Sequence, residues 1–372
     1  MDPRGRGAVT AEAGKGGLLS GLGARPAGGR LKRIQASPQW NDGRFDQGLP
    51  LHFDYPSMLG RFLRIGRAKA PSPPVPALAT DPALFSVPPA SGLRVTWLGH
   101  SSSLVELEGT RVLLDPMFGP RASPLSWAGP LRFHDPPLAV QDLPHLDAIV
   151  FSHDHYDHLD EGTVRALRHC GCPYIVPLGV GAHLERWGVP ADGIVEMDWW
   201  EERALGNTTL ACVPARHFSG RDFRRNATLW CGWALVGRER RLYYSGDTAY
   251  FAGFKDIGTR YGPFDVGLIE NGAYDKSWPD VHLGPEQAVQ ACLDAEARLF
   301  VPVHWGTFSL AVHGWTEPVE RLLVAAPAAG VAVAVPRPGQ SFEPSDPPPL
   351  VRWWPEERWE RAAEAPVRST GL

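Results

Sequence analysis

The sequence lacks any apolar run of about eighteen residues, the length that a membrane-spanning helix needs. Cysteine is scarce too: there are five, an odd number, and their spacing offers neither a disulfide framework nor a four-cysteine zinc site. We therefore expect a cytoplasmic location, with peripheral membrane contact left open. An excess of positive charge is also missing. Because the net charge is −4, we expect no nucleic-acid partner.

The chain organisation follows from length and composition. With 372 residues and 43% hydrophobic content, the chain fits one large domain with extensions better than several domains. We expect a disordered tail over residues 1–36, rich in Gly, Ala and Arg, and a Pro-rich extension over 37–91 that packs on the domain. The domain itself is expected over 92–343, followed by a C-terminal tail over 344–372.

Two segments raise the question of membrane contact. Residues 57–67 have the pattern of a short amphipathic helix with arginines between its apolar residues. Packing against the domain and lying on a membrane surface are both open, and packing is favoured. The C-terminal tail carries Trp353, Trp354 and Trp359 among charged residues. These rings either dock onto the domain or line an apolar entry.

The strongest signal is the run His153-Asp154-His155-Tyr156-Asp157-His158, which reads HxHxDH. It follows an apolar, strand-like segment over 146–151 and precedes a helix-like segment that opens near Asp160. Imidazole nitrogen binds zinc, iron or manganese, and a carboxylate helps to hold a second divalent cation beside the first. The hexapeptide therefore predicts ligands for two metal ions.

Three later residues complete the set, since His217, Asp247 and His304 each come just after an apolar, strand-like run. A single histidine beside a strand is more often an ordinary core or surface residue than a ligand. The ordered combination of HxHxDH, strand-His, strand-Gly-Asp and strand-His-Trp-Gly makes coincidence a poor explanation. Two cations that share a water lower its pKa toward neutrality, and phosphodiesters, lactones and β-lactams all suit such a centre.

The elements around these residues alternate. Strands are expected over 93–98, 103–108 and 111–114, a final strand over 330–335, and further strands before each ligand. Helices are expected over 162–169, 181–187, 285–297 and 317–326. Helices outside two facing sheets give a four-layer α/β fold, an αββα sandwich with the ligands along one edge.

This pattern resembles the metallo-β-lactamase superfamily of binuclear metallohydrolases, and most of all the N-acyl-phosphatidylethanolamine-hydrolysing phospholipases D and their bacterial relatives. The resemblance covers about residues 92–326. The residues that carry it are Thr96-Trp97-Leu98-Gly99-His100, Asp115-Pro116, Arg121-Ala122-Ser123-Pro124, the hexapeptide with Leu159-Asp160, Asp198-Trp199-Trp200-Glu201-Glu202, Gly246-Asp247-Thr248, Tyr261-Gly262-Pro263-Phe264-Asp265, Gly272-Ala273-Tyr274 and His304-Trp305-Gly306-Thr307-Phe308.

The resemblance implies a role for each ligand. His153, His155 and His217 would bind one zinc, Asp157, His158 and His304 the other, and Asp247 would bridge them. Iron or manganese remain open as the metal. Asp115 would accept a proton from a ligand imidazole and fix its tautomer, against the alternative of an ordinary Asp-Pro turn.

Residues outside the metal set each have two interpretations. His282 resembles a histidine that this family places beside the substrate phosphate, so we assign it a catalytic role, donating a hydrogen bond to a phosphoryl oxygen or the leaving group. A cap for the helix that follows is the alternative. Tyr274 either faces the site or packs in the core. Arg216 and Arg221, near His217, are interpreted as binding an anionic substrate, against the alternative of a solvated loop.

The leading functional hypothesis is a zinc-dependent phosphodiesterase of phospholipase D type, with a phospholipid or another anionic phosphodiester as substrate. A lactonase resembling the L-ascorbate-6-phosphate lactonases is the nearest alternative. An iron-dependent sulfur dioxygenase is a third hypothesis, disfavoured because such enzymes leave one metal site empty. A non-catalytic binding protein is disfavoured because all seven ligands are present. The family resemblance also implies a homodimer.

Overall fold

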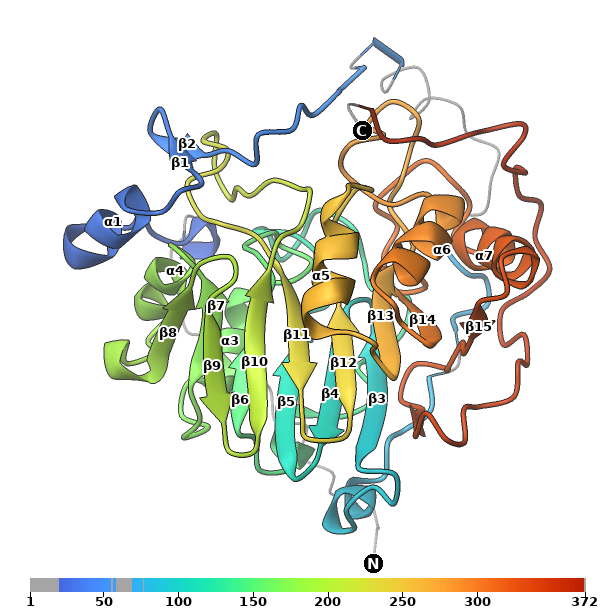
Figure 1. Ribbon diagram of the computed structural model, residues 1–372, viewed down its shortest axis with the longest axis horizontal. Coiled ribbons are helices and arrows are strands. Elements are labelled where there is room, and N and C mark those ends of the chain that lie inside the picture. Colours follow the sequence, from blue (N-terminus) through green and yellow to red (C-terminus); the bar gives the residue numbers. More distant parts are fainter. Residues whose placement is uncertain (1–19, 55, 58–68, 76, 371–372) are drawn as a thin grey trace, which may run out of the picture.

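The computed structural model describes residues 20–54, 56–57, 69–75 and 77–370. Two seven-stranded sheets face each other (Figure 1). In order across the first sheet, the strands are β16 (Ser341–Phe342), β3 (Leu93–Gly99), β4 (Ser102–Leu107), β5 (Thr110–Leu114), β6 (Ala148–Val150), β7 (Tyr174–Pro177) and β8 (Ile194–Met197). In the second they are β15 (Ala332–Val333), β14 (Leu299–Val303), β13 (Val266–Glu270), β12 (Arg241–Tyr244), β11 (Gly232–Val236), β10 (Thr208–Val213) and β9 (Glu202–Leu205).

Helices cover the outer face of each sheet. The α-helices of the described residues are α1 (Gly28–Gln35), α3 (Glu161–Leu167), α4 (Gly181–Arg186), α5 (Gly253–Tyr261), α6 (Pro285–Asp294) and α7 (Glu317–Ala328). Short 3-10 turns lie at Ser20–Leu22, Pro82–Ser86, Val140–Asp142 and Ala191–Gly193, and β1 (Trp40–Asn41) pairs with β2 (Arg44–Phe45). Helices α3 and α4 pack on the first sheet, and α5, α6 and α7 pack on the second. The predicted αββα sandwich is confirmed.

Alternation along the strands sorts the core into layers. On β10, Leu210 and Cys212 point between the two sheets, while Ala211 and Val213 pack under the outer helices. The predicted strands and four predicted helices are present with shifted ends, except that the final strand expected over 330–335 is reduced to β15 and is not the last strand. Helix α5 and the short strand β16, which closes the first sheet beside β3, were not predicted.

The expectation of disorder over residues 1–36 is wrong for residues 20–36. Helix α1 buries Ile34 completely against Phe45 and Trp230. Arg30 reaches Glu185 and Glu196 at 2.7 and 2.9 Å. Burial of Ile34 and ion pairs of Arg25, Arg30 and Arg33 hold this Gly- and Arg-rich segment on the domain, a pattern that composition does not reveal. Residues 1–19 lie outside the described part of the chain.

The C-terminal tail docks onto the domain. Trp353 and Trp354 are buried, and their rings lie 5.1 and 5.4 Å from that of Trp305. The indole N–H of Trp354 also donates to Glu320. These contacts answer the question that the sequence left open, since the two rings extend the core between the sheets.

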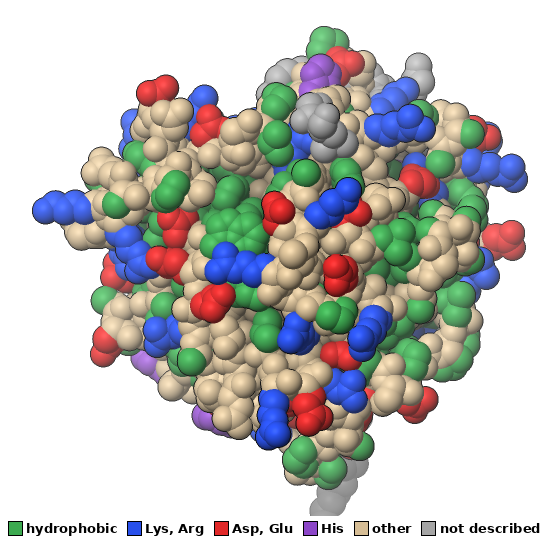
Figure 2. All heavy atoms as spheres, in the orientation of Figure 1, with side chains coloured by type: hydrophobic (Ala, Val, Ile, Leu, Met, Phe, Trp, Pro, Cys, Tyr) green, Lys and Arg blue, Asp and Glu red, His purple; other side chains and the backbone are tan. Residues whose placement is uncertain are grey.

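The remaining features of the fold concern membrane contact and surface charge. The helix expected over residues 57–67 falls outside the described residues except for its first residue. Among the residues that are described, no helix has the length and apolarity to cross a bilayer. Figure 2 shows acidic and basic side chains interspersed over one face of the molecule.

Candidate metal centre

All seven predicted ligands meet at one edge of the sandwich, because each follows the carboxyl end of a strand. The hexapeptide follows β6 of the first sheet, and His217, Asp247 and His304 follow β10, β12 and β14 of the second. Strand β11 is antiparallel to both β10 and β12, and β12, β13 and β14 are parallel to one another. Strands β10, β12 and β14 therefore run in the same direction and bring their ligands to the same edge (Figure 1).

The first group consists of His153, His155, His217 and Asp247, whose ligand atoms lie within 4.8 Å of one another. His155 Nδ1 is 2.9 Å from His153 Nε2 and 3.2 Å from His217 Nε2. Asp247 Oδ2 is 3.7 Å from His153 Nε2 and 3.8 Å from His217 Nε2. Three imidazoles with their nitrogens turned to one point are the donor set that a divalent metal ion prefers.

The second group consists of His100, Asp157, His158 and His304. Asp157 Oδ2 is 3.1 Å from His304 Nε2 and 3.0 Å from His100 Nε2. Asp247 reaches this group too, with Oδ1 at 3.0 Å from His158 Nε2 and Oδ2 at 3.0 Å from His304 Nε2. The carboxylate of Asp247 therefore stands between the two groups, where a bridging ligand has to be.

Asp115, at the end of β5, supports the second group from behind. Its Oδ2 lies 2.7 Å from His158 Nδ1. The Ser152 hydroxyl and backbone N–H donate to its two oxygens at 2.5 and 2.7 Å, and the Tyr244 hydroxyl also contacts it. This carboxylate fixes the orientation of the His158 ring, so the structure places Asp115 where the resemblance implied.

Electrostatics separate the imidazoles into two kinds. Burial and the neighbouring imidazoles hold the pKa of His153 and His217 well below the usual value, so both rings are neutral and ready to donate a lone pair. Burial opposes charge on His304 as well, yet Asp247 and Asp157 outweigh it and raise the pKa of His304 to about 10. The carboxylates thus attract positive charge to His304, whereas burial and the neighbouring His304 lower the pKa of His100, in the same group, to about 3.

The buried polar atoms also fit a cation. His158 Nε2 and Asp247 Oδ1 are buried and lie 3.0 Å apart, and neither makes a hydrogen bond of good geometry among the described residues. Buried polar atoms that lack such a bond are costly unless something binds them. A pair of divalent cations held by the two groups would satisfy both atoms, and the mixed imidazole and carboxylate donors suit zinc, iron or manganese.

Metal binding is expected to release protons. The raised pKa of His304 keeps its ring protonated at neutral pH in the metal-free protein, and a ligand must be deprotonated to bind. Apparent metal affinity should therefore rise with pH from neutrality toward about 10. Calorimetry at pH 7 in buffers of different ionisation enthalpy measures the released protons. An enthalpy that is the same in every buffer would contradict this expectation.

Two residues near the centre were not predicted to be part of it. His100 follows Gly99 at the end of β3, and Glu270 ends β13, so both share the strand-end position of the predicted ligands. Glu270 is fully buried and contacts His282 Nδ1, and its Oε1 is 3.6 Å from His304 Nδ1. Burial raises the pKa of the Glu270 carboxyl, and His282 only partly offsets it.

His282 reaches the centre. Its ring lies 5.1 Å from that of His217 and 5.3 Å from that of His304, and it lines the cavity in front of the ligands. The alternative of a helix cap is wrong, since α6 begins at Pro285 with Gly284 as its N-cap and no side-chain cap.

The cavity in front of the ligands has a volume of about 310 Å³. Five chemically active side chains line it: His155, Asp157, Asp247, His282 and His304. The rest of its wall is mostly apolar and comes from Phe53, Phe218, Ala273, Trp278, Val281 and Leu310, together with Arg225. The guanidinium of Arg225 lies 5.0 Å from the ring centres of both Phe53 and Phe218.

The predicted substrate contacts of Arg216 and Arg221 are wrong. The Arg216 side chain is fully buried, pairs with Asp280 at 3.0 Å, and donates to the carbonyls of Pro50, Tyr250 and Thr370. Arg221 donates to the carbonyls of Gly21, Asp154 and Leu159. Both guanidinium groups bind other parts of the protein, and neither lines the cavity in front of the ligands. Arg225, from the same cluster, is the one that reaches the cavity.

Tyr274 is not at the centre either. It is buried, its hydroxyl lies 3.1 Å from Glu317, and its ring stacks on His313 at 4.4 Å. Its packing interpretation fits these contacts, and Ala273 lines the cavity in its place.

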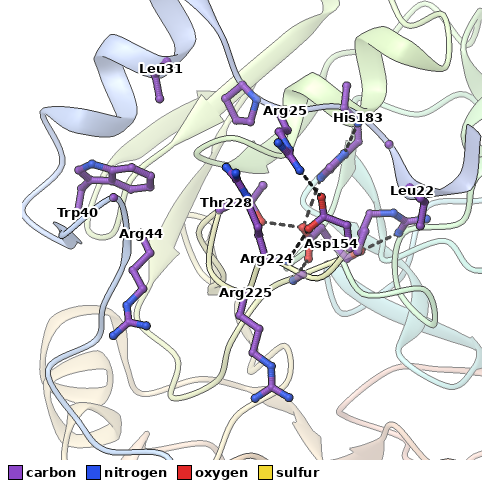
Figure 3. A pocket seen from close by; sticks show the side chains of 18 of the residues that line it. Leu22, Arg25, Leu31, Trp40, Arg44, Asp154, His183, Arg224, Arg225 and Thr228 are labelled. Atoms are coloured by element: carbon purple, nitrogen blue, oxygen red, sulfur yellow. Dashed lines mark hydrogen bonds and ion pairs between the residues drawn. The ribbon is translucent and has the colours of Figure 1, made fainter. Parts of the chain in front are cut away.

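Asp154, the remaining acid of the hexapeptide, points away from the ligands. It accepts hydrogen bonds from Thr228 and from the backbone of Gly220 at 2.8 Å each, and lies 3.3 Å from His183 Nε2 (Figure 3). It borders a second cavity of about 650 Å³. Asp154 therefore ties the hexapeptide to the loop that follows His217, which keeps the two ligand segments in register.

Comparisons with known proteins agree with this geometry. The model described as the Beta-lactamase superfamily domain matches residues 110–305, more than half of the chain. An uncharacterized protein of Mycobacterium tuberculosis is 48% identical over 91% of this chain and 92% of that protein. N-acyl-phosphatidylethanolamine-hydrolyzing phospholipase D 1 of Caenorhabditis elegans is 40% identical over 62% of this chain and 69% of that protein. Among solved structures, the metallo hydrolase Igni18 from Ignicoccus hospitalis has the same fold, with a TM-score of 0.53 and 22% identity over 68% of this chain and 98% of that one.

A sandwich with paired His and Asp groups at one edge defines a metal-dependent hydrolase. The chain belongs to the metallo-β-lactamase superfamily.

Proposed function

We propose that the protein is a phosphodiesterase of phospholipase D type that acts on a phospholipid or another anionic phosphodiester. The observation that carries this proposal is the cavity, in which two ligand groups joined by Asp247 open into a largely apolar wall that carries Arg225. An apolar wall with one cation suits an ester that has both a hydrocarbon part and a negative charge. The similarity to the phospholipase of Caenorhabditis elegans supports the same choice.

The residues named above would hold two cations, zinc in our proposal. Bound divalent cations supply a nucleophile at neutral pH and polarise the phosphoryl oxygens. His282 performs the protein's own step. Since its Nδ1 is held by Glu270, Nε2 is the nitrogen left to donate a proton toward the leaving oxygen of the substrate. The apolar wall excludes water from that donation.

Arg225 is proposed to bind the negative charge of the substrate. In an Arg225→Ala variant, KM for an anionic phosphodiester should rise about tenfold or more, because a charge-assisted hydrogen bond is worth about 1.5–3 kcal/mol. KM for a neutral lactone should not change. Arg224→Ala is the matched control, since Arg224 does not line the cavity in front of the ligands. Steady-state kinetics on both substrates measures the effect, and equal effects of the two variants would contradict it.

A substrate panel tests the proposed function directly. We expect hydrolysis of bis(p-nitrophenyl) phosphate and of N-acyl-phosphatidylethanolamine, its loss with a chelator, and its return when zinc is added. Turnover of lactones alone would favour the lactonase alternative instead. A single bound iron, found by metal analysis together with thiol oxidation, would favour the sulfur dioxygenase.

A further inference from the structure

Two of the five cysteines lie together in the turn between α3 and β7. The Sγ atoms of Cys170 and Cys172 are 2.9 Å apart, and Cys170 Sγ also lies 3.7 Å from the carbonyl of Cys172. Gly171, between them, has a φ of 77°, and nothing lies within 4 Å of the place where a side chain would be. This left-handed residue turns the backbone so that both sulfurs meet.

The two thiols differ in exposure and in acidity. Cys170 is partly exposed, whereas Cys172 is buried. A hydrogen bond from the Cys172 thiol lowers the pKa of Cys170 to about 6, so Cys170 is largely a thiolate at neutral pH. The same contact and burial raise the pKa of Cys172 far above its usual value. One sulfur is thus an accessible nucleophile, and the other is a protonated neighbour within reach.

The other three cysteines lack these properties. Cys212, Cys231 and Cys292 are buried, and burial raises the pKa of each thiol, that of Cys292 to about 12. A buried, protonated thiol is unreactive. Of the five sulfurs, Cys170 is therefore the one that is both partly exposed and acidic, and Cys172 is the thiol beside it.

We propose that Cys170 and Cys172 form a hydroperoxide-reactive dithiol that closes to a reversible disulfide. The Cys170 thiolate attacks the peroxide, the O–O bond breaks, and a sulfenic acid and hydroxide form. Cys172, losing its proton to that hydroxide, then attacks the sulfenic sulfur and displaces a second hydroxide, which leaves as water when it takes up a proton. In sum, two thiols and one hydroperoxide give one disulfide, water and an alcohol, or two waters when the oxidant is hydrogen peroxide.

The dithiol is separate from the metal centre. It lies before β7 at the amino end of that strand, whereas the ligands follow the carboxyl ends of strands. Strands β6 and β7 are parallel, so the two sites are at opposite edges of the first sheet. A bridge over three residues closes only a local turn. Hydrolysis should therefore be the same in the reduced and the oxidised protein, and the dithiol does not depend on the proposed function.

The test uses the full-length protein, reduced and then exposed to hydrogen peroxide. We expect two free thiols to be lost together, and peptide mapping to find Cys170 joined to Cys172. The rate of thiol loss should rise with pH with a midpoint near 6. Cys170→Ser should slow the loss about tenfold or more. Cys172→Ser should stop at a sulfenic acid on Cys170 that dimedone traps. Cys292→Ser, the control, should behave like the unmodified chain.

Metal content and melting temperature verify that each variant is folded. The proposal is overturned if the unmodified chain loses thiols no faster than the Cys170→Ser variant. It is also overturned if dimedone labels no sulfur in the Cys172→Ser variant, or if the bridge joins two chains.

Discussion

The Asp247→Asn variant is expected to lose about a thousandfold in turnover and to bind fewer than two cations. Asn keeps the shape but not the charge of the carboxylate that contacts both ligand groups. Charge stabilisation by bound metal is worth several kcal/mol, and about 4 kcal/mol corresponds to a thousandfold in rate. Metal analysis together with steady-state kinetics on a phosphodiester measures both losses.

The control for this variant is Asp265→Asn. Asp265 is also buried and paired, with Arg240 at 3.0 Å, but it lies just before β13, at the edge away from the ligands. The Asp265→Asn variant should have the same metal content and turnover as the unmodified protein. A variant at Asp247 that retains two cations and full activity would disprove the bridging role.

The second large effect is expected at His282. His282→Gln should lower kcat about a hundredfold or more, since a positioned proton donor contributes roughly 10²–10⁴ in rate. Metal content should stay at two ions, because His282 is proposed to act on the substrate. The effect should be smaller for a substrate with p-nitrophenolate as its leaving group, which needs little protonation. Comparing such an ester with an alkyl ester measures this.

Glu270→Gln tests how His282 is held. Glu270 is a positioning residue, so its loss should lower kcat less than the loss of His282 does and leave KM unchanged, because the imidazole remains while its carboxylate partner becomes an amide. The two variants together also distinguish another arrangement. Glu270, His282, Asp247 and His304 have ligand atoms close to one another. Loss of a cation in the His282→Gln variant would show that His282 is a ligand and not a proton donor.

The ligands were predictable because each one follows an apolar strand, and strand ends at one edge of a sheet bring distant segments together. The same rule could have found His100 and Glu270. His100 stands in the segment 96–100 that carries the family resemblance but was not assigned as a ligand, and Glu270 stands in no motif that sets it apart from other polar residues at strand ends. The fold class could be predicted for the same reason, since few folds other than an αββα sandwich combine alternating strands and helices with ligands at these strand ends.

The arginines show what the sequence could not provide. Arg216, Arg221 and Arg225 lie in one short basic stretch, and charge alone does not reveal which guanidinium faces the cavity. Burial decides it, because carbonyl groups from distant segments surround the first two, whereas Arg225 reaches the cavity wall. Contacts with residues that are far away in the sequence determine this outcome. Helix α1 escaped prediction for the same reason.

The carbonyl contacts of Arg216 have a consequence for protein engineering. Arg216 precedes His217 and is anchored to Pro50 on one flank of the domain and to Thr370 on the other, while Gln47 accepts a hydrogen bond from the His217 backbone. A shortened chain cut at residues 92 and 343 would remove two carbonyl partners of this guanidinium and leave it only Asp280 and the carbonyl of Tyr250. The flanking segments thus support the ligand segment around His217 from outside the domain. Removing them should weaken metal binding at conditions under which the sandwich is still folded.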